Sequence, residues 1–309
     1  MDRAKFIYFQ FMRKLRYILK KNDYKKTVFG KQINGIESGG GMIYELLMSK
    51  EPCFVGRIGS SEMQTLNACL NVKMGLKHNL PQEKIDTIYN NAGFFPKSEK
   101  LIWRFFEEYI SAIEKIDIMA VLGNGDEDYI LNRYCTNVDV ISLRAIEPYY
   151  SNEPWTRALE GKKILVIHPF AETIEEQFTK RERLFDNPYI LPNFELKTIK
   201  AVQTVADNTE GFDDWFQALD YMKEQIRKID FDIAIIGCGA YAFPLGAYVK
   251  KLGKKAIVLA GATQILFGIK GRRWDNHPVI SKLYNEYWVR PKENEKPKQY
   301  SRIEGGCYW

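Results

Sequence analysis

The chain has 309 residues, of which 45% are hydrophobic, and a formal net charge of +6. This length and apolar content suffice for a large buried core, in one large or two modest domains. Five cysteines without a CxxC pair, and three histidines without metal-ligand spacing, exclude a disulfide framework and a zinc knuckle and indicate a reducing, cytoplasmic setting.

The positive charge is concentrated at the start of the sequence. Residues 1–26 contain nine Lys or Arg against two Asp, a net charge of +7, which leaves the other 283 residues at 6 − 7 = −1. Because the rest of the chain is nearly neutral, the sequence predicts no general affinity for nucleic acid.

Residues 3–21 alternate large apolar and basic side chains at helical spacing, and residues 1–35 are treated as a basic amphipathic leader. The run carries too many charges to cross a bilayer, and no small-residue cleavage site follows it. Two interpretations stay open. The helix either lies on an anionic membrane surface, as on the inner face of the plasma membrane, or docks on the protein's own body.

A strand is expected from residue 53, ending at Gly59 and followed by a helix that begins near Ser61. This first elbow places Arg57 and Glu62 around a helix start. Ser60 and Ser61 are either helix caps with Glu62 as their capping-box partner, or neighbours of an arginine and a carboxylate that contact a bare or metal-bound diphosphate.

Residues 116–122 predict a buried strand that leads into an acidic glycine turn containing Asp126 and Asp128. Such a turn either binds a cation or simply starts a helix with acidic residues. The strand expected at 162–167 ends at His168, where α/β proteins place ligand contacts, although a structural histidine fits equally well. Further strands are expected at 138–143 and 196–202. Helices are expected at 42–50, at 81–115 (two helices), at 171–183 and at 213–228.

A second elbow lies in residues 231–261, which predict a strand, a glycine turn, a helix from Ala240 to Leu252 and another strand. Gly237 and Gly239 let backbone N–H groups approach a ligand above the strand. A dinucleotide is disfavoured, because no acidic residue follows the second strand, and a different nucleotide-like ligand is expected. The alternation predicts an α/β, doubly wound, mostly parallel Rossmann-like sheet with flanking helices.

Residues 263–274 follow the last strand with glycines, arginines and a tryptophan. Arg273 is suited to grip phosphate, and Gln264 and Trp274 are suited to form a platform for a sugar ring. The polar run from Pro291 to Ser301 is expected to be a flexible tail, so the main domain is placed at 36–290 and the tail at 291–309. The final five residues receive no role.

Two of these motifs resemble a known family. The segment Arg57-Ile58-Gly59-Ser60-Ser61-Glu62 resembles the Arg-x-Gly-Asp-Gly-Glu segment of bacterial glycosyltransferases of the GT-D fold, and residues 235–261 resemble their last strand-helix-strand unit. The likeness covers roughly residues 40–275. It implies a sugar-nucleotide-dependent transferase of surface glycans, such as capsule polysaccharide, with a divalent metal on the diphosphate. The family's metal-binding Asp-x-Glu pair is incomplete here, because Ser60 replaces the aspartate.

The leading hypothesis is therefore transfer of a sugar from a nucleoside-diphosphate sugar to a saccharide or lipid-linked acceptor. Glu62 is the first candidate for the base and Asp126 the second. The incomplete metal motif leaves three alternatives. Glu62 binds Mn or Mg with help from Asp126 or Asp128, or Arg57 and Arg273 balance the charge on the leaving diphosphate without metal, or activity is lost. Diphosphate contacts are expected from Arg57, Gly59, Ser60, Ser61, His168, Gly237, Gly239, Ala240, Tyr241 and Arg273.

Two other classes of function remain as alternatives. A methyltransferase or another nucleotide-cofactor enzyme would use Gly237 and Gly239 for its cofactor, and a non-catalytic scaffold of glycan assembly would explain the missing carboxylate. The leading hypothesis depends on one structural expectation, that the elbows after Arg57 and after Ile236 meet over one parallel sheet and form a cradle for an anionic leaving group.

Overall fold

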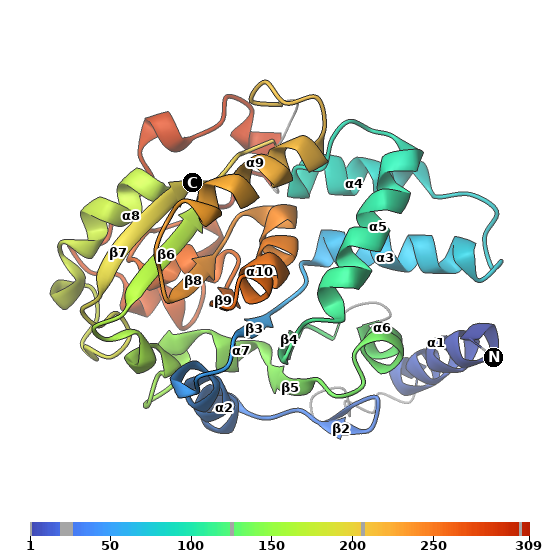
Figure 1. Ribbon diagram of the computed structural model, residues 1–309, viewed down its shortest axis with the longest axis horizontal. Helices are drawn as coiled ribbons and strands as arrows, with labels where there is room; N and C mark the ends of the chain where they lie inside the picture. Colours follow the sequence, from blue (N-terminus) through green and yellow to red (C-terminus); the bar gives the residue numbers. More distant parts are fainter. Residues whose placement is uncertain (1, 19–26, 124–126, 205–207, 303–304) are drawn as a thin grey trace.

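The computed structural model describes residues 2–18, 27–123, 127–204, 208–302 and 305–309 (Figure 1). Its centre is a seven-stranded sheet with the strand order β5-β4-β3-β9-β8-β6-β7, in which every neighbouring pair is parallel. The strands are β3 (Cys53–Gly56), β4 (Ile118–Val121), β5 (Asp139–Ser142), β6 (Lys163–His168), β7 (Glu195–Lys200), β8 (Ile233–Ile236) and β9 (Lys255–Val258). A separate antiparallel pair joins β1 (Thr27–Val28) to β2 (Lys31–Gln32).

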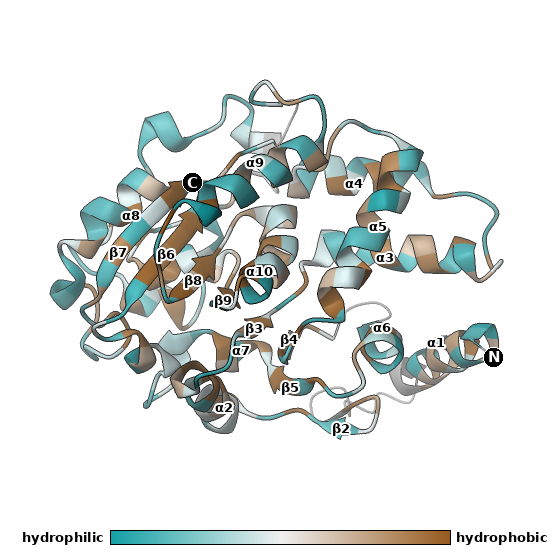
Figure 2. Ribbon diagram, in the orientation of Figure 1, coloured by the Kyte–Doolittle hydropathy of each residue, from teal (hydrophilic) through white to brown (hydrophobic). Residues whose placement is uncertain are grey.

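The strands form where the sequence has short, uninterrupted apolar runs. Every residue of β3, β4 and β8 is buried, as expected for strands covered on both faces. Side chains alternate between two hydrophobic cores: Phe54 belongs to the core on one face of the sheet, and Val55 to the core on the other. The hydropathy colouring shows these brown strands between mostly two-toned helices (Figure 2).

Helices cover both faces of the sheet, which confirms the predicted α/β doubly wound class. Helices α3, α5, α9 and α10 contribute to one core, and α2, α7, α8 and α11 to the other. The helices are α1 (Asp2–Ile18), α2 (Ile36–Met48), α3 (Ser60–Lys73), α4 (Gln82–Ala92), α5 (Glu99–Ile113), α6 (Glu127–Tyr134), α7 (Leu143–Ile146), α8 (Ala171–Phe178), α9 (Trp215–Arg227), α10 (Ala242–Lys251) and α11 (Ala262–Leu266).

The strand order positions the site. From β3 the chain builds β4 and β5 toward one edge, whereas β6 to β9 form the other half, and β9 returns to pair with β3. The order therefore reverses beside β3 and β9. In doubly wound sheets the crevice at such a reversal, outside the carboxyl ends of the strands, is where ligands bind.

Three predicted helices differ in extent from the observed ones. The helix expected at 42–50 begins already at Ile36. The helix expected at 171–183 ends at Phe178 and is followed by a separate 3₁₀ turn, Arg181–Arg183. The helix expected from Ala240 is preceded by a 3₁₀ turn, Gly239–Tyr241, and begins at Ala242.

The leader helix α1 docks on the body through one side. Phe6 is fully buried and packs edge-on against Tyr129 of α6, with ring centroids 4.7 Å apart. Gln10 donates a hydrogen bond of 3.2 Å to Asn71 near the end of α3. None of the helices described here is long and apolar enough to cross a membrane.

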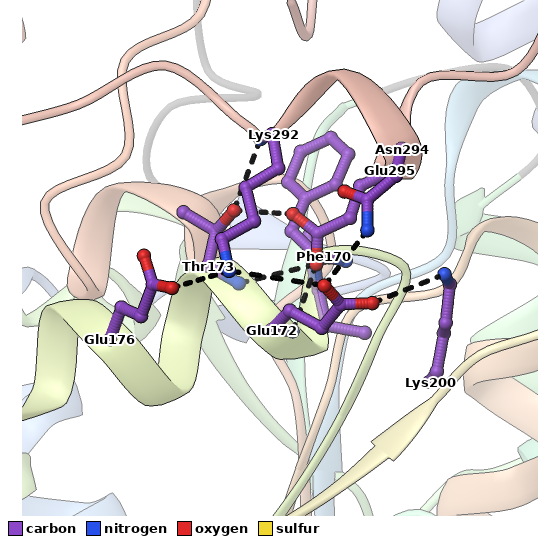
Figure 3. Close-up of polar contacts among 9 residues, drawn as sticks. Phe170, Glu172, Thr173, Glu176, Lys200, Lys292, Asn294 and Glu295 are labelled. Carbon is purple, nitrogen blue, oxygen red and sulfur yellow. Dashed lines mark hydrogen bonds and ion pairs between the residues drawn. The ribbon is translucent and has the colours of Figure 1, made fainter.

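The segment expected to be a flexible tail is packed on the body, which corrects that expectation (Figure 3). Glu295 is only 2% exposed, and its carboxylate accepts hydrogen bonds from the backbone N–H groups of Glu172 and Thr173 at 2.8 and 3.2 Å. It is also bonded to the Thr173 hydroxyl. Because the first N–H groups of a helix have no partner within the helix, this carboxylate caps the start of α8.

Candidate functional site

One pocket opens at the carboxyl ends of β3, β6, β8 and β9, and both glycine elbows line it. The two elbows are separated in sequence by almost 180 residues, but β3 and β8 are the two neighbours of β9 in the sheet. The elbows after Arg57 and after Ile236 therefore meet as expected. The predicted residues in the lining are Arg57, Gly59, Ser60, Ser61, Glu62, His168, Gly237, Gly239, Tyr241, Gln264 and Arg273.

Two predicted site residues in the described part of the chain, Ala240 and Trp274, are not among those that line the pocket. Ala240 is fully buried, and its carbonyl accepts a 2.7 Å hydrogen bond from the Tyr109 hydroxyl, which ties α5 to the second elbow. Trp274 is 7% exposed and packs on Gly271, so its indole lies inside the wall and does not form an open platform. Asp126 lies outside the described residues.

In the first elbow, the carboxylate of Glu62 lies against the backbone of Gly59. Gly59 is the N-cap of α3, so Ser60 and Ser61 are the first two helical residues and neither is the cap. Glu62, at the third position, folds back over Gly59: a β-carbon built on Gly59 would stand 2.1 Å from Glu62 Oε2. This is the position from which a capping-box glutamate reaches its N-cap. Glu62 is 7% exposed, and it borders both the cap and the pocket.

The second elbow is packed too tightly for any other residue at Gly237. A β-carbon there would lie 2.6 Å from Thr263 Oγ1, 2.7 Å from the Ala260 carbonyl and 2.8 Å from His168 Cδ2. Ala260 itself has a φ of +52°, in the left-handed region that alanine rarely adopts. One of the three non-glycine residues with positive φ in the described part of the chain therefore lies where β9 enters the pocket.

His168 is a neutral hydrogen-bond donor. Its ring is 4% exposed, and burial lowers its pKa to about 3. Nδ1 accepts the backbone N–H of Phe170 at 3.0 Å, which places the proton on Nε2. His168 can therefore donate one hydrogen bond to a ligand oxygen, but it supplies no positive charge to a diphosphate.

Three residues of the pocket wall carry a buried polar atom without a hydrogen-bond partner in the structure: Arg57 Nε, Gln264 Oε1 and Trp309 Nε1. Thr263 Oγ1, next to Gly237, is a fourth such atom close to the second elbow. Most buried polar atoms in proteins are hydrogen-bonded, and leaving one unpaired is unfavourable. The wall of the pocket is therefore less completely hydrogen-bonded than an ordinary protein interior.

A carboxyl group affects the electrostatics of Arg57. Burial raises the pKa of Glu147 to about 7, while the positive charges of Arg57 and Arg144 oppose this rise. The net charge beside Arg57 therefore changes near pH 7, when the Glu147 carboxyl group gains or loses its proton. Sequence reasoning did not single out Glu147, because the 147–155 segment reads only as a polar, aromatic loop.

The last residues of the sequence form a wall of the pocket, which sequence reasoning missed. Tyr308 and Trp309 both line it. Gln264 Nε2 donates to the Tyr308 carbonyl at 2.8 Å, and Arg273 donates from Nη1 to the Tyr308 hydroxyl at 2.9 Å. Trp309 is 8% exposed and packs edge-on against Phe170. Tyr308 and Trp309 are two large aromatic residues after a polar segment, which suggests that they pack on the protein. The sequence does not show which part of the protein they contact.

The described residues do not make a metal site. No three of their His, Cys, Asp and Glu side chains are grouped to hold an ion, and Glu62 is the sole carboxylate among the described lining residues. Mg²⁺ and Mn²⁺ prefer several oxygen ligands. Asp128, considered as a second ligand, is buried outside the lining, where it accepts the Tyr129 N–H at 2.8 Å and lies 4.0 Å from Arg13.

No family model and no curated protein matches the sequence. Two solved structures are similar to it. One is a selenomethionine-substituted structure of domain of unknown function 1792, 13% identical, covering 74% of this chain and 79% of that chain with a TM-score of 0.41. The other is described as the highly conserved domain of unknown function 1792 with a distinct glycosyltransferase fold, 13% identical, covering 85% and 92% with a TM-score of 0.44.

Proposed function

We propose that this chain is a glycosyltransferase that moves a sugar from a nucleoside-diphosphate sugar to a saccharide or lipid-linked acceptor. The observation that supports this best is the convergence of two glycine elbows on one pocket that Arg57 and Arg273 also line. The start of α3 borders the pocket, and the backbone N–H groups at a helix start favour an anionic ligand. A diphosphate is the anion that suits a site of this kind.

In the proposed reaction, an acceptor hydroxyl attacks the anomeric carbon of the sugar. The bond from that carbon to the diphosphate breaks, and the nucleoside diphosphate leaves with the electron pair. Arg57 and Arg273, the cationic residues in the described lining, balance the growing negative charge together with backbone amides. His168 donates a hydrogen bond through Nε2. Glu62 takes the proton of the acceptor hydroxyl.

The role of Glu62 is tested by Glu62→Gln. Loss of a general base lowers kcat by roughly 10²- to 10⁴-fold, whereas the fold should persist because the amide keeps the size of the side chain. Release of nucleoside diphosphate measures turnover, and Glu99→Gln, the same change at the exposed start of α5, is the matched control. An unchanged kcat in Glu62→Gln would remove this residue from the mechanism.

Of the routes left open above, we propose the one in which Arg57 and Arg273, which both line the pocket, balance the charge of the leaving diphosphate without a divalent ion. Turnover is then retained in EDTA and is not raised by added Mn²⁺ or Mg²⁺. Activity that disappears in EDTA and returns with Mn²⁺ would contradict this part of the proposal and would point to Asp126 as a second ligand.

A methyltransferase or another nucleotide-cofactor enzyme is the second candidate. Ala260 and Gly261 line the pocket after β9, where such enzymes commonly place an acidic residue for the ribose. The lack of an acidic residue there counts against this candidate. Thermal unfolding with UDP-, GDP- and CDP-sugars, S-adenosylmethionine and NAD separates the candidates, because a ligand that binds the folded state raises the unfolding temperature. Stabilisation by S-adenosylmethionine or NAD alone rejects the transferase, and no shift with any ligand favours a scaffold.

A further inference from the structure

Helix α1 has apolar side chains on two faces, and only one of them is covered. Phe6 is buried and Phe9 is partly buried against Tyr129 of α6. On the outer face, Tyr8 and Phe11 are 58% and 59% exposed, and the neighbouring Ile7 is 43% exposed. A helix that only docked on its own body would carry polar residues on its outer side.

This exposed apolar face is not ordinary surface. Eight large hydrophobic side chains are exposed in the described part of the chain, and three of them fall within five positions of α1. The other five are spread over distant segments: Met48, Tyr189, Tyr221, Leu252 and Val279. A cluster of this kind marks a binding surface, whereas isolated exposed residues do not.

Basic residues surround the cluster. Arg3, Lys5 and Lys14 are exposed on the same helix, and residues 1–26 together carry a net charge of +7. The acidic residue of the described helix, Asp2, lies 3.4 Å from Arg133 of α6, so its charge is balanced by the body. A second copy of the chain would bring an equal positive charge against this face, which opposes self-association through it.

We propose that the outer face of α1, formed by Ile7, Tyr8 and Phe11 with Arg3, Lys5 and Lys14, binds the surface of an anionic lipid bilayer. Aromatic and aliphatic side chains enter the boundary between headgroups and acyl chains, and the cations bind the negative headgroups. The body holds the helix in this orientation through Phe6 and through the hydrogen bond from Gln10 to Asn71.

The lipid-binding face is connected to the pocket by two helices. Glu127, the first residue of α6, accepts a 3.3 Å hydrogen bond from the backbone N–H of Leu122, a lining residue. Asn71 lies on α3 about 14 Å along the helix axis from Glu62. Figure 1 shows α1 beside α6, at the edge of the molecule away from β7. If the proposed transfer is correct, this placement suits an acceptor carried by the membrane. Lipid binding itself requires no sugar nucleotide.

The test is sedimentation of the full chain with vesicles. Binding is expected with vesicles of phosphatidylcholine and phosphatidylglycerol, is absent with phosphatidylcholine alone, and decreases as salt is raised. The double variant Tyr8→Ser/Phe11→Ser loses binding, whereas Tyr189→Ser/Tyr221→Ser, which changes exposed tyrosines elsewhere, retains it. Lys5→Gln and Lys14→Gln each weaken binding about fivefold.

Several outcomes overturn the proposal. Equal binding to neutral vesicles, or full binding by Tyr8→Ser/Phe11→Ser, shows that this face is not an anionic-lipid surface. Failure of the parent chain to sediment, with a dimer that is lost in the double variant, assigns the face to self-association. Melting temperatures establish that each variant is folded. Turnover with a soluble acceptor in a protein that does not bind vesicles rejects the lipid proposal alone and leaves the proposed transferase intact.

Discussion

The carboxylate of Glu62 lies directly against the α-carbon of Gly59, so that a β-carbon on Gly59 would stand 2.1 Å from Oε2. The glycine is needed here for space and not for its backbone angles, because its φ of −67° and ψ of 158° are open to any residue. A change at Gly59 therefore moves the candidate base without straining the chain.

This contact predicts that Gly59→Ala lowers kcat while the protein stays folded. Only the end of a flexible side chain must move, so the free energy of unfolding should fall by about 1 kcal/mol or less. Gly237→Ala is the contrasting variant, because its β-carbon meets a backbone carbonyl at 2.7 Å, and overpacking of this kind costs about 1 to 3 kcal/mol. Urea unfolding and nucleoside diphosphate release measure both effects. Full turnover in Gly59→Ala would show that the position of Glu62 is unimportant.

The buried His168 makes stability depend on pH. Its pKa falls from an ordinary 6.5 to about 3 in the folded state, so between these values the unfolded chain binds a proton that the folded chain does not. The His168 contribution is complete above pH 6.5 and is lost as pH falls toward 3, at about 1.4 kcal/mol per pH unit. The slope of unfolding free energy between pH 6.5 and 4.5 should therefore decrease in His168→Gln.

The matched control for that measurement is His78→Gln, at an exposed histidine on the surface. Equal slopes for the parent chain and His168→Gln would mean that His168 titrates normally in the folded protein. Its assignment as a histidine that stays neutral in the pocket at acidic pH would then be wrong.

The cap formed by Glu295 predicts that the last segment stabilises the whole domain. In Glu295→Gln the start of α8 loses a buried, charged acceptor for three donors, and the free energy of unfolding should fall by about 1 to 3 kcal/mol. Glu293→Gln, at an exposed residue of the same 3₁₀ turn, should change it little. Chemical denaturation followed by tryptophan fluorescence measures both. Equal stabilities would mean that the segment is held elsewhere.

Tyr308 holds a candidate phosphate-binding group in place. Tyr308→Phe removes the hydroxyl that accepts from Arg273 Nη1 at 2.9 Å, but it keeps the ring that borders Gly261. Without this hydrogen bond the Arg273 guanidinium is held less firmly and should bind the donor less well, with KM raised roughly tenfold and kcat nearly unchanged. Tyr300→Phe, whose ring packs on Trp309, is the control in the same segment. A fall in kcat at constant KM would place Tyr308 in the chemical step instead.

The sheet could be predicted because its signals are local. Uninterrupted apolar runs such as Ile233–Ile236 encode buried parallel strands, and the glycines after them encode sharp turns, so the doubly wound class and the meeting of the elbows follow from short stretches of sequence. Because β3, β9 and β8 are neighbouring parallel strands, their carboxyl ends lie at the same edge of the sheet.

The remaining features depend on contacts between distant residues. Trp274 has the composition of a sugar platform, but packing on Gly271 and beside Gly261 buries it. The 291–301 segment is polar enough for a tail, and nothing local shows that Glu295 reaches a helix start 122 residues earlier. Tyr308 likewise reaches the pocket through bonds to Gln264 and Arg273, which a single sequence does not reveal.

The place of β9 has a consequence for synthesis. It is the last strand in the described part of the chain, yet it lies in the middle of the sheet between β3 and β8. During synthesis, β3 and β8 therefore lack their shared neighbour until residues 255–258 have been made, and unpaired strand edges promote aggregation. A nascent chain stopped before residue 255 would consequently have neither a closed sheet nor a complete pocket.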